Sequence, residues 1–214
     1  MIIAIDGPAA AGKGTLAKFL AERFNLALLD TGLLYRGVGK KILSNHQDPN
    51  DREIAETVAR SLLFDDLNDN SLRTEEVARA ASQVSSIPGV REALLEFQRN
   101  FANNPGQKFK GAVLDGRDIG TVVCPDAEIK IFLCASVEVR AKRRYKELME
   151  RGHKVIYSQI LFELNERDTR DMKRTNAPLK AASDAFIIDT GELNADEVFK
   201  AALDFVMRHD FSLV

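Results

Sequence analysis

Residues 7–15, Gly-Pro-Ala-Ala-Ala-Gly-Lys-Gly-Thr, have the residue types and the spacing of a loop that cradles phosphate groups. Glycines allow backbone N–H groups to turn inward around a phosphate, and the amino terminus of a following helix adds its positive dipole end. Lys13 brings a mobile positive charge to the β- and γ-phosphate oxygens of a nucleotide. The nucleotide would contact Gly7, Pro8, Ala9, Ala10, Ala11, Gly12, Lys13, Gly14 and Thr15.

One position of this loop departs from the common pattern. Gly14 follows Lys13 where Ser or Thr is usual, so the hydroxyl group of Thr15 comes one residue late. We expect Thr15 to lie near the phosphates and Mg²⁺, and the metal to be held through water rather than directly by the hydroxyl group. The alternative is a glycine-rich turn with an unrelated lysine. The position of the loop, after an apolar run and before an amphipathic helix, favours the phosphate site.

A second candidate anion site begins at Asp30-Thr31-Gly32, where a strand would end and a helix begin. Thr31 and the helix amino terminus could hold an anion there. Arg36, about one helical turn further along, could bind it with two hydrogen bonds. The alternative, which the sequence leaves open, is a capped helix with one surface arginine.

A third candidate is Asp115-Gly116-Arg117-Asp118-Ile119-Gly120, again after an apolar run. Arg117 would clamp a phosphate, and Asp118 could accept a hydrogen bond from a donor such as the exocyclic amine of a base. The alternative is a loop in which the arginine is neutralised by its two aspartate neighbours.

The fourth candidate is the charged run at residues 166–174. On a helix, Arg167, Asp171 and Arg174 fall at i, i+4 and i+7, so one face carries two guanidinium groups around a carboxylate. Phosphoryl transfer needs such positive charge because negative charge spreads over the moving group. The alternative is a solvated helix with ion pairs along its surface. Further arginines that would stand beside the phosphate loop are Arg140, Arg143 and Arg144.

The strands that must position these groups are visible as short apolar runs. Four of them end in Asp with Gly one or two residues later, and they cover residues 2–6, 26–30, 112–115 and 186–189. A fifth run, residues 129–133, lacks the Asp. Apolar runs that alternate with helical patterns predict an α/β chain with a twisted parallel sheet covered on both faces. All four Asp–Gly junctions would then face the ligand crevice at the carboxyl edge of the sheet.

Local signals also predict where several helices begin. Pro88 opens one helix, and Ser136 caps another that ends near Gly152. Asn194 with Glu197 has the pattern of a capping box at the start of the last helix.

Composition excludes several classes of protein. The chain has 214 residues, and its 30 Lys and Arg against 32 Asp and Glu give a net charge of −2, which argues against a broad electrostatic surface for nucleic acid or membrane. Cys124 and Cys134 show neither disulfide nor zinc spacing. No apolar run approaches the length of a membrane span, and no basic region precedes the apolar start of the chain. We expect a cytoplasmic monomer that binds neither nucleic acid nor membranes.

Taken together, these motifs resemble the bacterial cytidylate kinase family, and the resemblance runs nearly end to end. It implies transfer of the γ-phosphoryl group of ATP, bound as MgATP, to CMP or dCMP, giving ADP and CDP or dCDP. The matching motifs are residues 6–15, 29–32 with Tyr35 and Arg36, residues 80–84, 90–94, 115–118 and 166–174.

The same resemblance implies roles for individual residues. Contacts to cytosine would come from Ser82, Arg91 and Asp118. The CMP phosphate would be held by Arg36, Arg117 and Arg174, with Thr31 near it. The ribose would be held by Arg167 and Asp171, and Arg170 would belong to a lid that closes over ATP and expels water. Phosphoryl transfer itself is assigned to Lys13, Arg117, Arg167 and Arg170.

The fold that the resemblance implies is the three-layer P-loop kinase fold, with a five-stranded parallel sheet, an inserted NMP-binding lobe and a short helical lid. Within a single kinase domain of residues 1–214, the core would comprise residues 1–36, 108–150 and 183–214. The NMP-binding insertion would cover about residues 37–107 and the lid about residues 151–176. Family members carry a longer, strand-containing insertion, whereas here Phe64 passes to Thr74 through a short polar loop, which predicts a trimmed and more helical lobe.

Three other classes of protein share a phosphate loop. A GTPase switch is disfavoured because the chain contains neither Asn-Lys-x-Asp nor Asp-x-x-Gly. An RNA-binding ATPase that uses Arg140, Arg143, Arg144 and Lys146 would need aromatic stacking platforms, yet the chain is 7% aromatic and has no Trp. A kinase for UMP, AMP or shikimate is a closer alternative. Asp118 disfavours UMP, since a uracil carbonyl facing the carboxylate costs about 1–3 kcal/mol.

Overall fold

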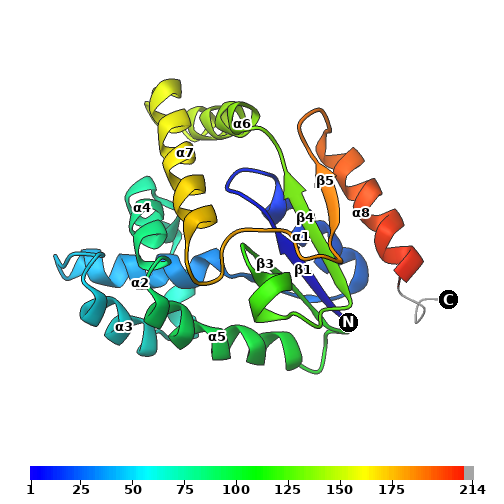
Figure 1. The fold of residues 1–214 in the computed structure, drawn as a ribbon, viewed down its shortest axis with the longest axis horizontal. Helices are drawn as coiled ribbons and strands as arrows, with labels where there is room; N and C mark the ends of the chain where they lie inside the picture. Colours follow the sequence, from blue (N-terminus) through cyan, green and yellow to red (C-terminus); the bar gives the residue numbers. More distant parts are fainter. Residues whose placement is uncertain (210–214) are drawn as a thin grey trace. The chain divides into compact units, whose positions relative to one another are not determined.

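The computed structural model describes residues 1–209 (Figure 1). The chain divides into two compact units, which we call the core unit and the helical unit. Met1–Leu29 and Ala102–Val214 form the core unit, and Asp30–Phe101 form the helical unit.

A five-stranded sheet lies at the centre of the core unit, with strand order β2-β3-β1-β4-β5. Its strands are β1 (Ile2–Asp6), β2 (Ala27–Asp30), β3 (Ala112–Gly116), β4 (Ile129–Cys134) and β5 (Phe186–Asp189). β1 pairs in parallel with both β3 and β4, and β4 pairs in parallel with β5. Each of the five apolar runs forms one of these strands, so the predicted parallel sheet is confirmed. The register places Asp6 opposite Gly116, so the loops after β1 and β3 begin side by side.

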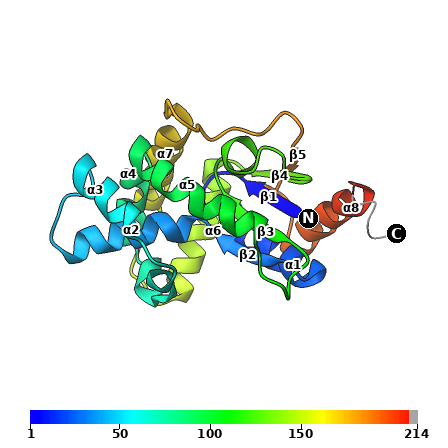
Figure 2. The same cartoon turned by 90° about the horizontal axis from the view of Figure 1, so that it is seen from below.

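The helices of the core unit are α1 (Lys13–Phe24), α6 (Val137–Glu150), α7 (Tyr157–Lys173) and α8 (Ala195–His209), with a short π-helical turn, η3 (Ile119–Val123). Helices α1 and α8 pack together against the sheet (Figure 2). Their apolar faces close over sheet residues such as Ile3, Ile131 and Leu133. Helices α6 and α7 pack on each other through a second apolar cluster, which Ala9 of the phosphate loop joins.

The predicted capping signals are confirmed. The Ser136 hydroxyl accepts a hydrogen bond from the backbone N–H of Val139 at 3.3 Å at the start of α6. Asn194 and Glu197 exchange two bonds at the start of α8, since each side chain accepts from the backbone N–H of the other residue, at 3.0 and 2.8 Å.

The helical unit contains α2 (Gly32–Ser44), α3 (Arg52–Arg60), α4 (Glu75–Val84) and α5 (Pro88–Asn103), with two short 3₁₀ turns, η1 (Phe64–Asn68) and η2 (Asn70–Arg73). Pro88 opens α5 as the sequence predicts. All of the elements described between Gly32 and Asn103 are helical, which agrees with a trimmed, helical lobe. Over residues 1–209, no helix combines the length and the apolar character that a membrane crossing requires.

Candidate active site

The phosphate loop leaves β1 at Gly7 in a conformation that excludes other residues. Gly7 has φ of +148°, and a Cβ atom at this position would lie 2.2 Å from the carbonyl oxygen of Leu133. Gly12, with φ of +96°, then caps the amino terminus of α1. The loop therefore ends where the backbone N–H groups of a helix begin, as the sequence predicts for a phosphate site.

Lys13 is held over this loop. Its side chain is 6% exposed, and its Nζ atom donates to the carbonyl oxygen of Pro8 at 2.9 Å. The carboxylate of Asp115 on β3 lies 3.8 Å from the same nitrogen. The ammonium group is thus positioned by two oxygens and is within reach of any phosphate that the loop holds.

Two carbonyl groups of the loop are hydrogen-bonded from outside. The Ala9 carbonyl accepts from Arg140 at 3.2 Å, and the Ala11 carbonyl accepts from the hydroxyl of Thr190 at 3.2 Å. Arg143 in turn donates to the Thr190 hydroxyl at 2.9 Å. Arg140 therefore contacts the phosphate loop directly and Arg143 reaches it through Thr190, as expected of arginines beside this loop.

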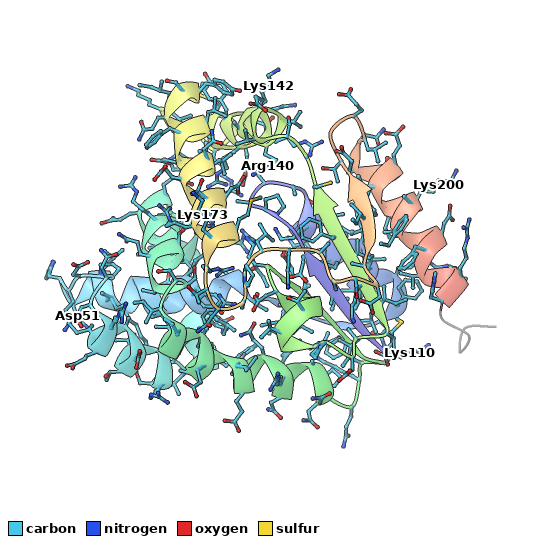
Figure 3. All side chains as sticks on the ribbon, in the orientation of Figure 1. Asp51, Lys110, Arg140, Lys142, Lys173 and Lys200 are labelled. Carbon is cyan, nitrogen blue, oxygen red and sulfur yellow. The ribbon has the colours of Figure 1, made fainter. Side chains whose placement is uncertain are left out.

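Arg140 also joins the loop to α7. Its guanidinium group donates to the carboxylate of Asp168 at 2.6 Å, and both side chains are buried. Figure 3 shows Arg140 on α6. The Nε atom of Arg140 donates to the carbonyl oxygen of Ala135 at 3.0 Å. Sequence reasoning missed this pair, and it treated Arg144 as a third member of the cluster. Arg144 instead pairs with Glu147 on its own helix at 2.7 Å.

Asp171 on α7 gathers three arginines. Its carboxylate accepts from Arg117 at 3.1 Å and lies 4.0 Å from a nitrogen of Arg167 and 4.0 Å from a nitrogen of Arg174. Burial, at 3% exposure, would raise the pKa of Asp171, but the three guanidinium groups together bring it below its ordinary value. One carboxylate among three guanidinium groups leaves two net positive charges, which suits an anion with two negative charges. The structure brings these four predicted site residues together.

Asp118 lies directly before η3 and is 5% exposed. The next two backbone N–H groups, of Ile119 and Gly120, donate to the carboxylate of Asp6 at 2.8 and 2.7 Å. The pKa of Asp6 is raised to about 6, because burial and the negative charge of Asp118 outweigh the two N–H groups and the positive charge of Lys13. Sequence reasoning placed Asp6 at a strand end facing the ligand crevice and did not predict its bonds to η3.

The predicted residues of the helical unit have partners of their own. Arg36 donates to the carbonyl oxygen of Leu72 at 2.7 Å. Arg91 donates to the carbonyl oxygen of Ser85 at 3.3 Å, and its guanidinium carbon lies 5.4 Å from the ring centroid of Tyr35. Ser82 and Thr31 are both buried.

The four strand-end aspartates fall into two kinds. Asp30 and Asp189 accept from the N–H of the glycine two residues on, at 3.0 and 2.8 Å, and so close their own turns. Asp6 and Asp115 are followed directly by glycine and are buried near Lys13. At the end of β5, Thr190 rather than the exposed Asp189 reaches the phosphate loop.

Oxygen donors for a metal ion are few. Within residues 1–209, no group of three or more His, Cys, Asp or Glu side chains could hold a metal ion. Thr15 is exposed at the loop, and Asp115 lies beside Lys13. Mg²⁺ usually retains several waters and takes one or two protein oxygens together with substrate phosphates, so this small donor set fits Mg²⁺ brought in with a nucleotide.

The sheet of the core unit has counterparts among solved P-loop kinases. A shikimate kinase from Bacteroides thetaiotaomicron superposes with a TM-score of 0.51 at 13% identity, and the match covers 97% of each chain. At this level of identity the match concerns the fold alone, and the predicted P-loop kinase fold is confirmed.

Comparison of sequences is more specific. The cytidylate kinase of Paramagnetospirillum magneticum is 58% identical over 96% of this chain and 97% of its own. The cytidylate kinase of Methylocella silvestris is 54% identical, and the match covers 98% of this chain and 96% of its own. The family model for cytidylate kinase matches residues 3–208, and the chain belongs to the cytidylate kinase family.

Proposed function

We propose that this chain transfers the γ-phosphoryl group of ATP to CMP or dCMP, giving ADP and CDP or dCDP. Membership of the cytidylate kinase family supports the acceptor. The observation that carries the proposal is the convergence of Arg117, Arg167 and Arg174 on the buried Asp171. A kinase whose acceptor is itself a phosphate ester needs a second anion site besides its phosphate loop, and this cluster supplies two net positive charges.

We assign the acceptor phosphate to Arg117 and Arg174, together with Arg36 and with Thr31 near it. Arg167 and Asp171 are assigned to the ribose. Asp171 limits the repulsion among the arginines, which would otherwise disfavour their gathering before the acceptor arrives. The hydrogen bonds that hold Arg36 and Arg117 to carbonyl groups support this role because they restrict each guanidinium group to one orientation.

The base is assigned to Ser82, Arg91 and Asp118. A buried carboxylate accepts from the cytosine amino group, and an arginine donates to the cytosine ring nitrogen and carbonyl oxygen. Asp118 is buried and is fixed by the π-helical turn that follows it, since its carbonyl oxygen accepts from the N–H groups of Val122 and Val123 at 2.9 and 3.1 Å. A fixed carboxylate discriminates more sharply between an amine and a carbonyl group than a mobile one does.

We assign phosphoryl transfer to Lys13, Arg117, Arg167 and Arg170, which would stabilise the charge of the moving group by position and electrostatics. ATP contacts residues 7–15, and Mg²⁺ would be held by the Thr15 hydroxyl through water, with the Asp115 carboxylate in support. When bound, Mg²⁺ neutralises charge on the phosphate oxygens. In this account residues 151–176 act as a lid, about residues 37–107 act as the NMP-binding lobe, and the core comprises residues 1–36, 108–150 and 183–214.

We further propose a cytoplasmic monomer without nucleic-acid or membrane partners. The net charge of −2 supports the part of this proposal that concerns nucleic acid and membranes, because binding to polyanions is driven by a broad positive surface.

The proposal is tested by following ATP, Mg²⁺ and CMP with ³¹P NMR and determining initial rates for an Arg174→Met variant. We expect ADP and CDP to form in equal amounts. Arg174→Met should raise the KM for CMP by about tenfold or more and change the KM for ATP little, since it removes one charged contact to the acceptor phosphate. Arg208→Met is the matched control, because Arg208 is exposed in the last turn of α8, outside the proposed site. ATP hydrolysis without CDP, or an unchanged KM for CMP in Arg174→Met, would contradict the proposal.

A further inference from the structure

Asp6 is the last residue of β1 and the residue before the phosphate loop, yet its contacts lie on η3. Its two carboxylate oxygens each accept one hydrogen bond: Oδ1 from the N–H of Ile119 at 2.8 Å and Oδ2 from the N–H of Gly120 at 2.7 Å. The side chain is 4% exposed, so no bulk water shares these contacts. Both donors follow Asp118 directly in the chain.

A carboxylate is the side chain that fits this place. Two consecutive N–H groups present two donors and no acceptor, and an ionised carboxylate offers two acceptors and no donor. An asparagine could satisfy one N–H group and would face the other with its own NH₂ group. A buried polar group left without a partner is costly, so the backbone after residue 118 would have to shift.

The surrounding packing leaves the backbone little room for a different position. A Cβ atom at Gly120 would lie 3.2 Å from the Cδ atom of Lys130 and 3.5 Å from the Oδ2 atom of Asp6. The buried Lys130 is itself fixed, because its ammonium group donates to Asp184 at 2.7 Å. The turn thus lies against both Lys130 and Asp6 at Gly120.

We propose that Asp6 is the positioning residue for base selection, because it fixes the backbone that carries Asp118 and so the direction of the Asp118 carboxylate. This inference rests on the proposed function, in which Asp118 reads the cytosine amino group. Asp6 itself touches no part of the acceptor in this account. Its effect therefore appears as a loss of discrimination between CMP and UMP rather than as a general loss of turnover.

The ionised form of Asp6 is the one that accepts both bonds, so discrimination is expected to depend on pH. Burial, together with the negative charge of Asp118, raises the pKa of Asp6 to about 6, against the two N–H groups and the positive charge of Lys13. Two other charged groups approach the same region: Asp115 on β3, which lies 3.8 Å from the Lys13 nitrogen, and Lys130 on β4. Below pH 6 a protonated Asp6 would keep one acceptor and turn a hydroxyl donor toward the other N–H group.

The test is the ratio of kcat/KM for CMP to kcat/KM for UMP, measured in the wild-type protein and in Asp6→Asn, Asp118→Ala and Asp189→Asn. The two acceptors carry the same phosphate group, so its titration cancels in the ratio. We expect Asp6→Asn to narrow the ratio at neutral pH by about tenfold, the worth of about one hydrogen bond, and to leave the KM for ATP within about twofold. Asp189→Asn is the matched control, since Asp189 also ends a strand of the sheet but is exposed and bonds to its own turn. It should keep the wild-type ratio.

The outcomes separate the two claims. An unchanged ratio in Asp6→Asn, with a narrowed ratio in Asp118→Ala, overturns the role of Asp6 and leaves the proposed function in place. A purely structural role would lower kcat/KM for both acceptors alike, which also overturns it. An unchanged ratio in Asp118→Ala removes Asp118 from base recognition and the inference with it. Should Asp6→Asn fail to fold, the wild-type ratio decides: it must fall as the pH decreases through about 6, and a constant ratio overturns the inference.

Discussion

The guanidinium group of Arg140 donates to the carboxylate of Asp168 at 2.6 Å, and neither side chain is more than 11% exposed. The same guanidinium donates to the carbonyl oxygen of Ala9, so one residue connects the phosphate loop with α7. Removal of one member of a buried ion pair leaves the other charge without its counterion. We expect Asp168→Asn to lower the free energy of unfolding by about 3 kcal/mol and to raise the KM for ATP.

A double-mutant cycle measures this coupling. Arg140→Met, Asp168→Asn and the double variant are compared by urea unfolding, and the double variant should be more stable than the sum of the two changes predicts, by about 2 kcal/mol. Lys146→Met, in the exposed pair of Lys146 and Glu150 on the same helix, should change stability by less than about 1 kcal/mol. Additive effects of the two substitutions would show that Arg140 and Asp168 are not energetically coupled.

Lys13 gives the most direct test of the phosphate loop. We expect Lys13→Met to lower kcat by about two orders of magnitude or more, because the positive charge at the β- and γ-phosphates is lost. The apolar stem is retained, so circular dichroism should remain close to that of the wild-type protein, while the buried Asp115 loses its counterion and the melting temperature falls. Near-normal turnover in a folded Lys13→Met variant would remove the loop from catalysis.

Asp171 should stabilise the protein in a manner that depends on pH. Since its arginine neighbours hold its pKa below the ordinary value, its contribution is present above about pH 4 and is lost as the pH falls through the lowered pKa. We expect Asp171→Asn to lower the free energy of unfolding at pH 7 by about 3 kcal/mol, because three guanidinium groups then repel one another. The difference from the wild-type protein should shrink at acid pH, and added phosphate should restore part of the stability at pH 7. A difference that is the same at all pH values would contradict this account.

The contribution of Asp6 to stability should depend on pH in the opposite direction. Its pKa is raised to about 6 from 3.8, so the folded protein binds the extra proton between these values and loses stability as the pH rises through them. Asp6→Asn cannot ionise, so it removes this loss, although its amide group leaves one buried N–H group without an acceptor at every pH. The stability of the variant relative to the wild-type protein should therefore be higher above pH 6 than below about pH 4, by up to about 3 kcal/mol. Urea unfolding at both pH values checks this, and a difference that is the same at both would contradict the raised pKa of Asp6.

Local signals explain why much of the fold could be predicted from sequence. Each strand is a short apolar run, and the signals at Pro88, Ser136 and Asn194 act within one turn of their helices. Helical spacing likewise placed Arg167 and Arg174 beside Asp171. Arg117, which donates to the same carboxylate, is 54 residues away in the sequence, so helical spacing could not predict this contact.

The residues that sequence reasoning missed depend on packing between distant elements. Arg140 meets Asp168 because α6 lies on α7, and a run of arginines in the sequence does not distinguish a buried support from a phosphate ligand. For Asp6 a signal was present. Asp30 and Asp189 have glycine two residues on and bond to its N–H, whereas Asp6 has glycine at the next position and its carboxylate bonds to another segment.

The central claim is that the protein is a kinase for cytidine monophosphates, and ADP release in the presence of ATP and Mg²⁺ tests it most directly. The acceptors to compare are CMP, dCMP, UMP, AMP, GMP and shikimate, each at the same concentration. We expect fast release with CMP and dCMP, slower release with UMP by about tenfold or more, and little with the others. Release that is equally fast with UMP would contradict the role of Asp118, and release that is fastest with AMP, GMP or shikimate would contradict the claim itself.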